Sequence, residues 1–472
     1  RPLRHPLRQW RDRKARVPEE TIPRPRDLWI WDERSGQAIV TMRPEDRHRL
    51  YPADRAWQQV RAVLARGLPV WRRYRALVQG AFAQPVDMRG RIGMAIEPGA
   101  PHPERRLALL AELGDIPVLI RIYHHETREE RNVRLALVRE LHGQGKRIGL
   151  ALIQDRRAVA DPQRWEDFVR DVLQHVGHIV EWLEAGHAVN RVKWGVWGFR
   201  EYRRFMRHTR RALRAFPGVR VTGPAVIDFD LPYLLAALDA LPGNMNLYAV
   251  SSHLYVDRRG APENRQGRYA TLEKAAWARA AAAASPHCAS RLIVSEVNWP
   301  LQGTGVYSPV GSPYVSPGER RNDPSVDEDD YAAFMVRYLL IAICSGLVDR
   351  VYWWRLVARG YGLVDDTDDD PAAWRRRPAF DAMKTVLSVL GQATFRGSPV
   401  TDPGTHLYLF EVEHGGRIGV GWSEDGTGRV RLPFAAVCAI DMVGRDVTVP
   451  GDPDGALRVG PAPVYLFEEA RV

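Results

Sequence analysis

The chain has 472 residues, of which 45% are hydrophobic and 26% charged, as in ordinary folded globular proteins. This length exceeds that of one small domain and supplies enough apolar material for a large core. Basic residues outnumber acidic ones by 68 to 57, giving a net charge of +11. The excess reflects either a GC-rich genome or attraction to an anionic partner. We find no nucleic-acid-binding motif, so an acidic glycan or a membrane surface ranks above nucleic acid as that partner.

The cysteines and the apolar segments limit which disulfides, metal sites and cellular locations we expect. Cys288, Cys344 and Cys438 lie far apart, so we expect no disulfide framework, no metal site and no cofactor. Cys344 lies in "YLLIAICSGLV", which is too short for a membrane span, and we expect it to be a buried small hydrophobe. The chain has no apolar signal core, which slightly favours a cytoplasmic location. The oligomeric state stays open.

The first predicted elements form an N-terminal extension. Residues 1–26 are rich in Arg and Pro and predict an extended arm. Residues 27–42 predict two short strands that turn near Ser35. Residues 54–82 have helical spacing, with a break expected near Pro69.

From about residue 90, short apolar runs alternate with helical segments. The eight runs are "GRIGMAIE", "IPVLIRIYHH", "KRIGLALIQD", "HIVEWLEAG", "GVRVTGPAVID", "LYAVSSHLYVD", "RLIVSEVNWP" and "DRVYWWRLV". Helical patterns such as "REERNVRLALVRELHGQG" lie between most of them, which is typical of an α/β (β/α)8 TIM barrel. An open doubly wound sheet is disfavoured, because no Gly-rich dinucleotide turn follows the first run.

The sequence pattern changes after about residue 390. Short alternating strands broken by Gly, Asp and Pro, such as "THLYLFEVEHGG", predict a C-terminal antiparallel β-sandwich. We therefore predict three parts: an N-terminal arm and helical extension (1–85), the barrel (86–390) and the β-sandwich (391–472).

Catalytic groups of such barrels lie where the strands end, at the C-terminal face. Polar or aromatic residues follow all eight predicted strands in this chain. In strand order they are Glu97; Arg121 and His124; Asp155; His187; Asp228 and Asp230; His253 and Tyr255; Glu296 and Trp299; and Trp353 and Trp354.

Several of these residues have a plain structural interpretation as well. Glu97 precedes a proline and fits a loop acid, and His253 fits a satisfied core histidine. Arg121 lies in an apolar strand and needs an anionic partner, for which Glu184 is the natural choice. Glu296 is hardest to explain structurally, because a carboxylate inside "LIVSEVNWP" is costly unless it is paired or used.

Two further pairs are open to the same alternative. Asp228 and Asp230 fit caps of the following helix. Trp353 and Trp354 fit core packing for one indole and a sugar platform for the other.

Together these motifs resemble the retaining glycoside hydrolases of clan A, and most of all the family 39 branch. "IVSEVNWP" resembles the nucleophile strand of the clan with Glu296 as nucleophile, and "SSHLY" its His-x-Tyr on strand six. "RIYHH" resembles its strand-two Arg, "VYWWRL" its strand-eight Trp, and "PVYLFE" a strand of its appended β-sandwich. The resemblance covers about residues 90–472 and implies hydrolysis of an oligo- or polysaccharide.

Strand four departs from the clan pattern, which ends in Asn-Glu with the Glu as acid/base. "EAGHAVNR" aligns through Glu184 and Gly186, which puts His187 and Ala188 in those two positions. Alanine cannot transfer a proton, and retaining chemistry needs a group that protonates the leaving oxygen.

Three interpretations remain open. Another group donates the proton, with His187 the first candidate, Asp155 and Glu97 the next, and Glu201 also nearby. Alternatively the leaving group needs little protonation, or the site only binds.

The segment after strand four also bears on the substrate. Asn190, Arg191 and Lys193 place two cations beside the expected cleft and favour an acidic sugar, although a solvated loop is the simpler alternative. We predict an atypical O-glycosyl hydrolase acting on an acidic, bacterial surface glycan with Glu296 as nucleophile. The alternative is a non-catalytic glycan-binding or polysaccharide-assembly protein on a lapsed hydrolase scaffold.

Overall fold

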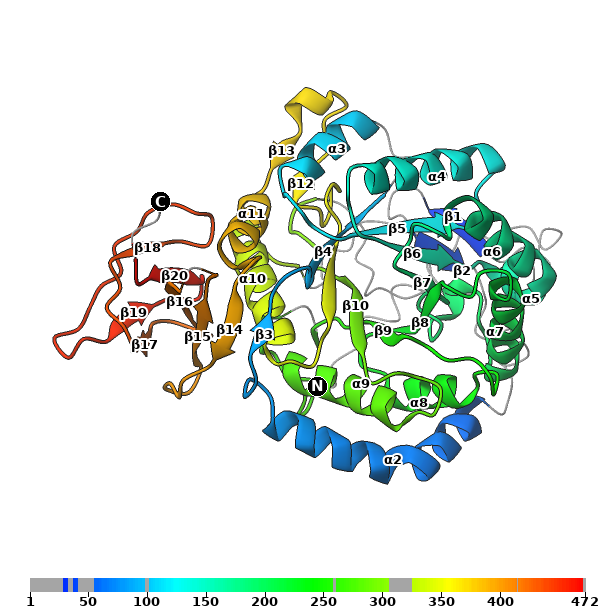
Figure 1. Ribbon diagram of the computed structural model, residues 1–472, viewed down its shortest axis with the longest axis horizontal. Helices are drawn as coiled ribbons and strands as arrows, with labels where there is room; N and C mark the ends of the chain where they lie inside the picture. Colours follow the sequence, from blue (N-terminus) through cyan, green and yellow to red (C-terminus); the bar gives the residue numbers. More distant parts are fainter. Residues whose placement is uncertain are drawn as a thin grey trace, which may run out of the picture.

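The computed structural model describes residues 29–32, 37–40, 55–97, 102–257, 260–304, 325–413 and 415–469. Eight parallel strands close into a barrel at its centre, with helices around the outside (Figure 1). The barrel strands are β4 (Ile92–Ile96), β5 (Val118–Tyr123), β6 (Ile148–Ile153), β7 (Trp182–Ala185), β8 (Arg220–Ile227), β9 (Ala249–His253), β10 (Leu292–Val297) and β11 (Arg350–Trp354). Each lies within one of the eight predicted runs, so the predicted barrel is confirmed.

Helices follow the strands and cover the barrel wall. They are α3 (Pro103–Ala111), α4 (Arg128–Gly143), α5 (Arg156–Ala160), α6 (Pro162–Val176), α7 (Phe199–Leu213), α8 (Leu231–Asp239), α9 (Thr271–Ala284), α10 (Glu328–Cys344) and α11 (Pro378–Leu390). Local chemistry sets their starts: at α4, Thr127 and Glu130 form a reciprocal capping box. Cys344 is fully buried at the end of α10, as predicted. Among the described helices, none combines the length and apolar character that crossing a membrane requires.

The long helix α2 (Arg55–Gln79) lies outside the barrel against α8 and α9, at the bottom of Figure 1. Its 25 residues run without interruption through Pro69, so the predicted break is wrong. Proline removes one backbone hydrogen bond, but burial of Ala62 and Val70 on either side holds the helix against its neighbours. Tertiary packing therefore overrides the local helix-breaking signal.

The N-terminal hairpin lies at the mouth of the barrel. Its strands are β1 (Trp29–Asp32) and β2 (Gln37–Val40), which pair antiparallel as predicted, whereas the expected turn at Ser35 and the arm over residues 1–26 lie outside the described residues. The ring of Trp31 lies 4.9 Å from Tyr123 and 4.6 Å from His125, centroid to centroid. The extension thus contacts the end of β5.

The C-terminal region forms an antiparallel β-sandwich beside the barrel, as predicted. A six-stranded sheet has the order β18-β20-β16-β15-β14-β3, and β17 and β19 form a second, two-stranded sheet. The strands are β14 (Thr394–Gly397), β15 (Thr405–Glu411), β16 (Arg417–Ser423), β17 (Gly428–Val430), β18 (Cys438–Ile440), β19 (Leu457–Val459) and β20 (Val464–Phe467). Leu407, Val430 and Leu466 are buried between the two sheets.

One strand of this sheet comes from the other end of the chain. β3 (Val86–Asp87) precedes the first barrel strand, yet Val86 pairs with Phe395 of β14. Residues 86–87, which the sequence assigns to the start of the barrel part, thus extend the C-terminal sheet. The short strands β12 (Val364–Asp365) and β13 (Arg375–Arg376) pair separately, between β11 and α11.

Candidate active site

Glu296 lies near the carboxyl end of β10 and is 5% exposed. Arg121 of β5 donates a hydrogen bond to its Oε2, and the hydroxyl of Tyr255 donates one to its Oε1. Burial opposes ionisation, but the charges of His253 and Arg121 and the hydrogen bonds from Tyr255 and Arg121 outweigh it and lower the pKa of Glu296 to about 2. The carboxylate is therefore ionised at neutral pH.

Arg121 joins Glu296 to the aromatic wall of the barrel. Its guanidinium carbon lies 3.3 Å from the ring centroid of Trp354 on β11. The expectation that Glu184 is its partner is wrong, because the arginine reaches across the barrel to β10 instead. The planar guanidinium stacks on Trp354, and its charge pairs with Glu296. The stack therefore helps to orient the arginine that binds this carboxylate.

A second buried carboxylate lies on the other side of His253. The His253 Nε2 atom is 3.8 Å from Oε1 of Glu184, and its Nδ1 atom is 3.9 Å from Oε2 of Glu296. Glu184 and His253 are each 1% exposed. The sequence suggests Glu184 only as a structural partner of Arg121; the signal for a role in the site is a carboxylate inside the apolar strand β7, where an unused charge is costly.

His187 completes this buried cluster. Its ring lies 4.5 Å from that of His253 and 4.4 Å from that of Trp194. One ligand atom each from Glu184, His187 and His253 lie within 4.8 Å of one another, and two imidazoles with one carboxylate form a donor set used by zinc and iron. The charge of Arg121, which acts on His187, would also repel a divalent cation there. The donor set fits a metal, whereas the local charge opposes one.

The state of His187 bears on its predicted role as proton donor. Burial and the positive charges of Arg121, His253 and Lys193 lower the pKa of His187 well below its usual value. The ring is therefore neutral at neutral pH, which leaves it no imidazolium proton to donate. Ala188 beside it is fully buried with a φ of 42°, a left-handed conformation that most residues other than glycine adopt with strain.

Asp155 and Glu97, the other predicted donors, are both held in the ionised form. Burial raises the pKa of Asp155, but hydrogen bonds from His124 and from the N–H of Ala158, where it caps α5, lower it further than burial raises it. Burial also raises the pKa of Glu97. The charge of Arg134 and a 2.8 Å hydrogen bond from Tyr123 lower it, and the net pKa is below the usual value. Neither carboxylate carries a proton to donate at neutral pH.

Lys193 has the protonation behaviour that these residues lack. It lies in the short 3-10 turn after β7 and is 6% exposed. Burial lowers the pKa of Lys193 to about 8, against the opposing attraction of Glu296. An ammonium with this pKa is protonated at neutral pH and can release its proton readily.

The two other polar residues of this segment bind the barrel itself. The amide of Asn190 donates to the carbonyl of Ile227 and accepts from its N–H, both at 3.0 Å. Arg191 pairs with Asp228, and Asp230 caps α8 by accepting from the N–H of Tyr233, a role that the sequence suggested. These bonds fix the segment after β7 against β8.

The tryptophans that the sequence suggests for sugar binding are buried, whereas a side chain that stacks on a sugar must expose one face of its ring. Trp299 and Trp353 stack with centroids 5.7 Å apart, and both are fully buried. The Trp353 indole N–H donates to the hydroxyl of Tyr331. Trp354 is 4% exposed and Arg121 covers one of its faces. These indoles therefore support the core beneath the site.

Comparison with known proteins bears on the fold. No family model matches the chain, and no curated protein matches it in sequence. Among solved structures, the catalytic domain of GH30 xylanase C from Talaromyces cellulolyticus is similar in fold, with a TM-score of 0.51. The superposition covers 83% of this chain and 99% of that domain, at 8% sequence identity.

Two further structures give similar values. A family 51 α-L-arabinofuranosidase from Bifidobacterium longum covers 81% of this chain and 97% of its own at 14% identity, with a TM-score of 0.52. The match to the GH39 enzyme from Xanthomonas axonopodis pv. citri covers 82% of this chain and 95% of that enzyme at 15% identity, with a TM-score of 0.51. The chain thus has the (β/α)8 fold of clan A glycoside hydrolases, as the motif order predicts.

Proposed function

We propose that this protein is an atypical O-glycosyl hydrolase in which Glu296 is the nucleophile. The observation that carries the proposal is the setting of Glu296: an ionised carboxylate at the carboxyl end of the seventh strand of a clan A barrel, held by Arg121 and Tyr255. A carboxylate that attacks the anomeric carbon must be ionised and fixed in place, and this one meets both requirements.

Lys193 is the proposed proton donor. Its pKa of about 8 lies closest to neutrality among the proposed donors, and its charge interacts with that of Glu296. In the first step Glu296 bonds to the anomeric carbon while the Lys193 ammonium protonates the departing glycosidic oxygen. In the second, the neutral amine accepts a proton from water, whose oxygen displaces Glu296.

The proposed substrate is an oligo- or polysaccharide with an anionic sugar. The ammonium of Lys193 supports this choice, because it is a buried cation whose charge acts on Glu296. Arg121 and Arg191 support it less than their charges suggest, because each is bonded to a carboxylate of the chain.

A second candidate, a glycan-binding protein without catalysis, is favoured by one observation. The motif resemblance places Ala188 in the acid/base position of the clan, and burial leaves little room for a larger side chain there. On this view the buried polar cluster would serve recognition alone.

Turnover of acidic and neutral oligosaccharides by the wild type and by Glu296→Gln tests the proposal. We expect hydrolysis of an acidic glycan by the wild type and a loss of at least about 10³-fold in the variant, or roughly 4 kcal/mol of barrier. Glu181→Gln is the matched control, because Glu181 pairs with Arg350 just before β7, at the opposite end of the barrel strands. Binding without turnover by the wild type, with unchanged affinity in Glu296→Gln, would favour the second candidate.

A further inference from the structure

Helix α2 presents an apolar stripe to solvent on the side opposite the barrel. Of nine large hydrophobic side chains that are exposed in the described part of the chain, six lie on this helix. Five of them follow helical spacing on one line: Trp57, Val60, Leu64, Leu68 and Trp71. Leu64 is 76% exposed and Trp57 62%. At 1.5 Å per residue, the stripe is about 21 Å long.

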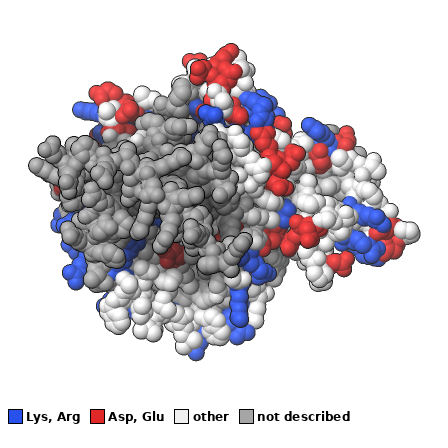
Figure 2. Space-filling model, turned by 180° about the vertical axis from the view of Figure 1, so that it is seen from behind, with Lys and Arg blue, Asp and Glu red and all other residues white. Residues whose placement is uncertain are grey.

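Arg61, Arg72 and Arg75 lie on or beside this stripe by helical spacing, whereas Arg55 and Arg66 bond to the body of the protein. The sequence of α2 contains no Asp or Glu. The guanidinium of Arg75 lies 5.2 Å from the ring of Trp71, so charge and aromatic surface alternate at one end. In Figure 2 the lower edge of the molecule, where α2 lies in Figure 1, shows basic and uncharged residues without acidic ones.

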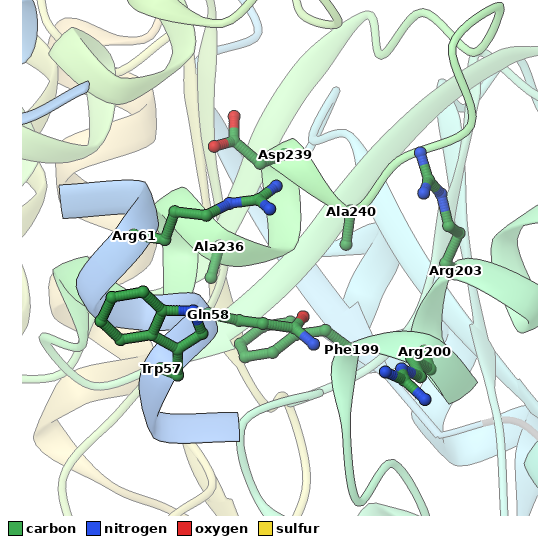
Figure 3. A pocket seen from close by; sticks show the side chains of 9 residues that line it. All are labelled: Trp57, Gln58, Arg61, Phe199, Arg200, Arg203, Ala236, Asp239 and Ala240. Atoms are coloured by element: carbon green, nitrogen blue, oxygen red, sulfur yellow. The ribbon is translucent and has the colours of Figure 1, made fainter. Parts of the chain in front are cut away.

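A basic pocket lies beside the stripe, between α2 and the helices α7 and α8. It has a volume of about 400 Å³. Trp57 and Arg61 line it from α2, and Phe199, Arg200 and Arg203 from α7 (Figure 3). Among the described residues, Arg61 and Arg203 form no ion pair with a carboxylate of the chain.

The one acidic residue of the pocket is already neutralised. Asp239, at the end of α8, accepts a 3.0 Å hydrogen bond from the guanidinium of Arg66. The pocket therefore keeps a net positive charge from its other arginines, and a phosphate group matches guanidinium donors in charge and geometry.

We propose that α2 and this pocket bind the surface of an anionic phospholipid bilayer, with the stripe at the level of the acyl chains and lipid phosphates at Arg61 and Arg203. An apolar helix face bordered by basic residues, with tryptophans at both ends, is the pattern of a helix that lies in the membrane interface. This is a binding activity separate from the proposed hydrolysis.

A second copy of the chain fits this face less well. A two-fold contact through α2 would bring the stripe and its bordering arginines against the same residues of the other copy. Because α2 has no carboxylate to pair with them, the two copies would repel each other. Lipid phosphates supply the missing negative charge.

Co-sedimentation of the full chain with vesicles tests the proposal. We expect binding to vesicles of phosphatidylcholine mixed with phosphatidylglycerol, weaker binding to phosphatidylcholine alone, and a loss of binding as salt rises. Leu64→Ser with Leu68→Ser should weaken binding at least about tenfold, because two apolar side chains no longer leave water. Arg61→Ala with Arg203→Ala should weaken it roughly fivefold for each charge removed.

Matched controls come from exposed residues elsewhere. Val133→Ser with Val400→Ser, and Arg128→Ala with Arg139→Ala, should leave vesicle binding unchanged. Equal binding to both kinds of vesicle, equal losses in the control variants, or binding of inorganic phosphate without binding of vesicles would overturn the proposal. A dimer in sedimentation equilibrium that Leu64→Ser with Leu68→Ser dissociates would also overturn it and assign the face to self-association.

Discussion

The side-chain amide of Gln154 bonds the backbone of His187 on both sides: it donates to the His187 carbonyl and accepts from its N–H, each at 2.8 Å. Gln154 follows β6 and His187 follows β7, so this one side chain ties two neighbouring strand ends together. The same amide donates to the carbonyl of Trp194, which extends the tie across the segment that carries Lys193.

Replacing Gln154 by alanine should therefore destabilise the protein and misplace this segment. Two buried backbone groups of His187 would lose their partners, which costs about 1–3 kcal/mol for each unsatisfied group. Urea denaturation of Gln154→Ala should show this loss, whereas Gln163→Ala, at an exposed position on α6, should change stability by less than about 0.5 kcal/mol. Equal stability of the two variants would contradict a tethering role.

Acid should reveal the ion pair of Glu296. Its pKa is lowered to about 2, so its contribution to stability is complete above its unfolded value of 4.5 and is lost as pH falls toward 2. That contribution is about 3 kcal/mol for a shift from 4.5 to about 2. In urea titrations, the gap in stability between wild type and Glu296→Gln should narrow from pH 5 downward. Parallel curves across this window would show that Glu296 has no lowered pKa.

The pH dependence of turnover should report Lys193. A donor with a pKa of about 8 must be protonated, so the rate should fall as pH rises through about 8. Lys193→Met should lose most activity and regain it on substrates whose leaving group needs no proton, such as nitrophenyl glycosides. Lys384→Met, at an exposed position on α11, should keep the wild-type profile. An unchanged alkaline limb in Lys193→Met would exclude Lys193 as the donor.

Trp353 should behave as a core residue. Its ring is fully buried and stacked on Trp299, so Trp353→Ala should cost about 3–5 kcal/mol of unfolding free energy. Trp353→Phe should cost less and leave KM for the glycan unchanged, because no ligand reaches the ring. A rise in KM for Trp353→Phe without a change in stability would instead make it a sugar platform.

The positions of the barrel strands could be predicted because each is an apolar run with a polar end. Parallel strands place those ends at one face, which is why Glu296, Arg121, Tyr255 and His253 come together as the motif order indicates. Which of these groups pair with one another could not be predicted. Pairing depends on how the side chains are oriented inside the barrel, where Arg121 reaches Glu296 rather than Glu184.

Proton-transfer roles were the hardest to predict, because they depend on burial and charge that neighbouring elements supply. Nothing in the local sequence shows that His187 is buried among cations or that Lys193 is buried at all. Helix α10 has a weak sequence signal for a related reason. Most of its residues are buried, so it lacks the polar face by which a surface helix is identified.

The pairing of β3 with β14 has a consequence for biosynthesis. Val86 leaves the ribosome about 300 residues before its partner Phe395. Chains are made from the N-terminus at about 5–20 residues per second, so this strand waits with open hydrogen-bonding groups for at least roughly 15 seconds. The edge of β14 would lose this neighbour in any chain that begins after Asp87. The C-terminal sheet therefore depends on a strand that precedes the barrel in the chain, and β14 gains this neighbour only after the whole barrel has been synthesised.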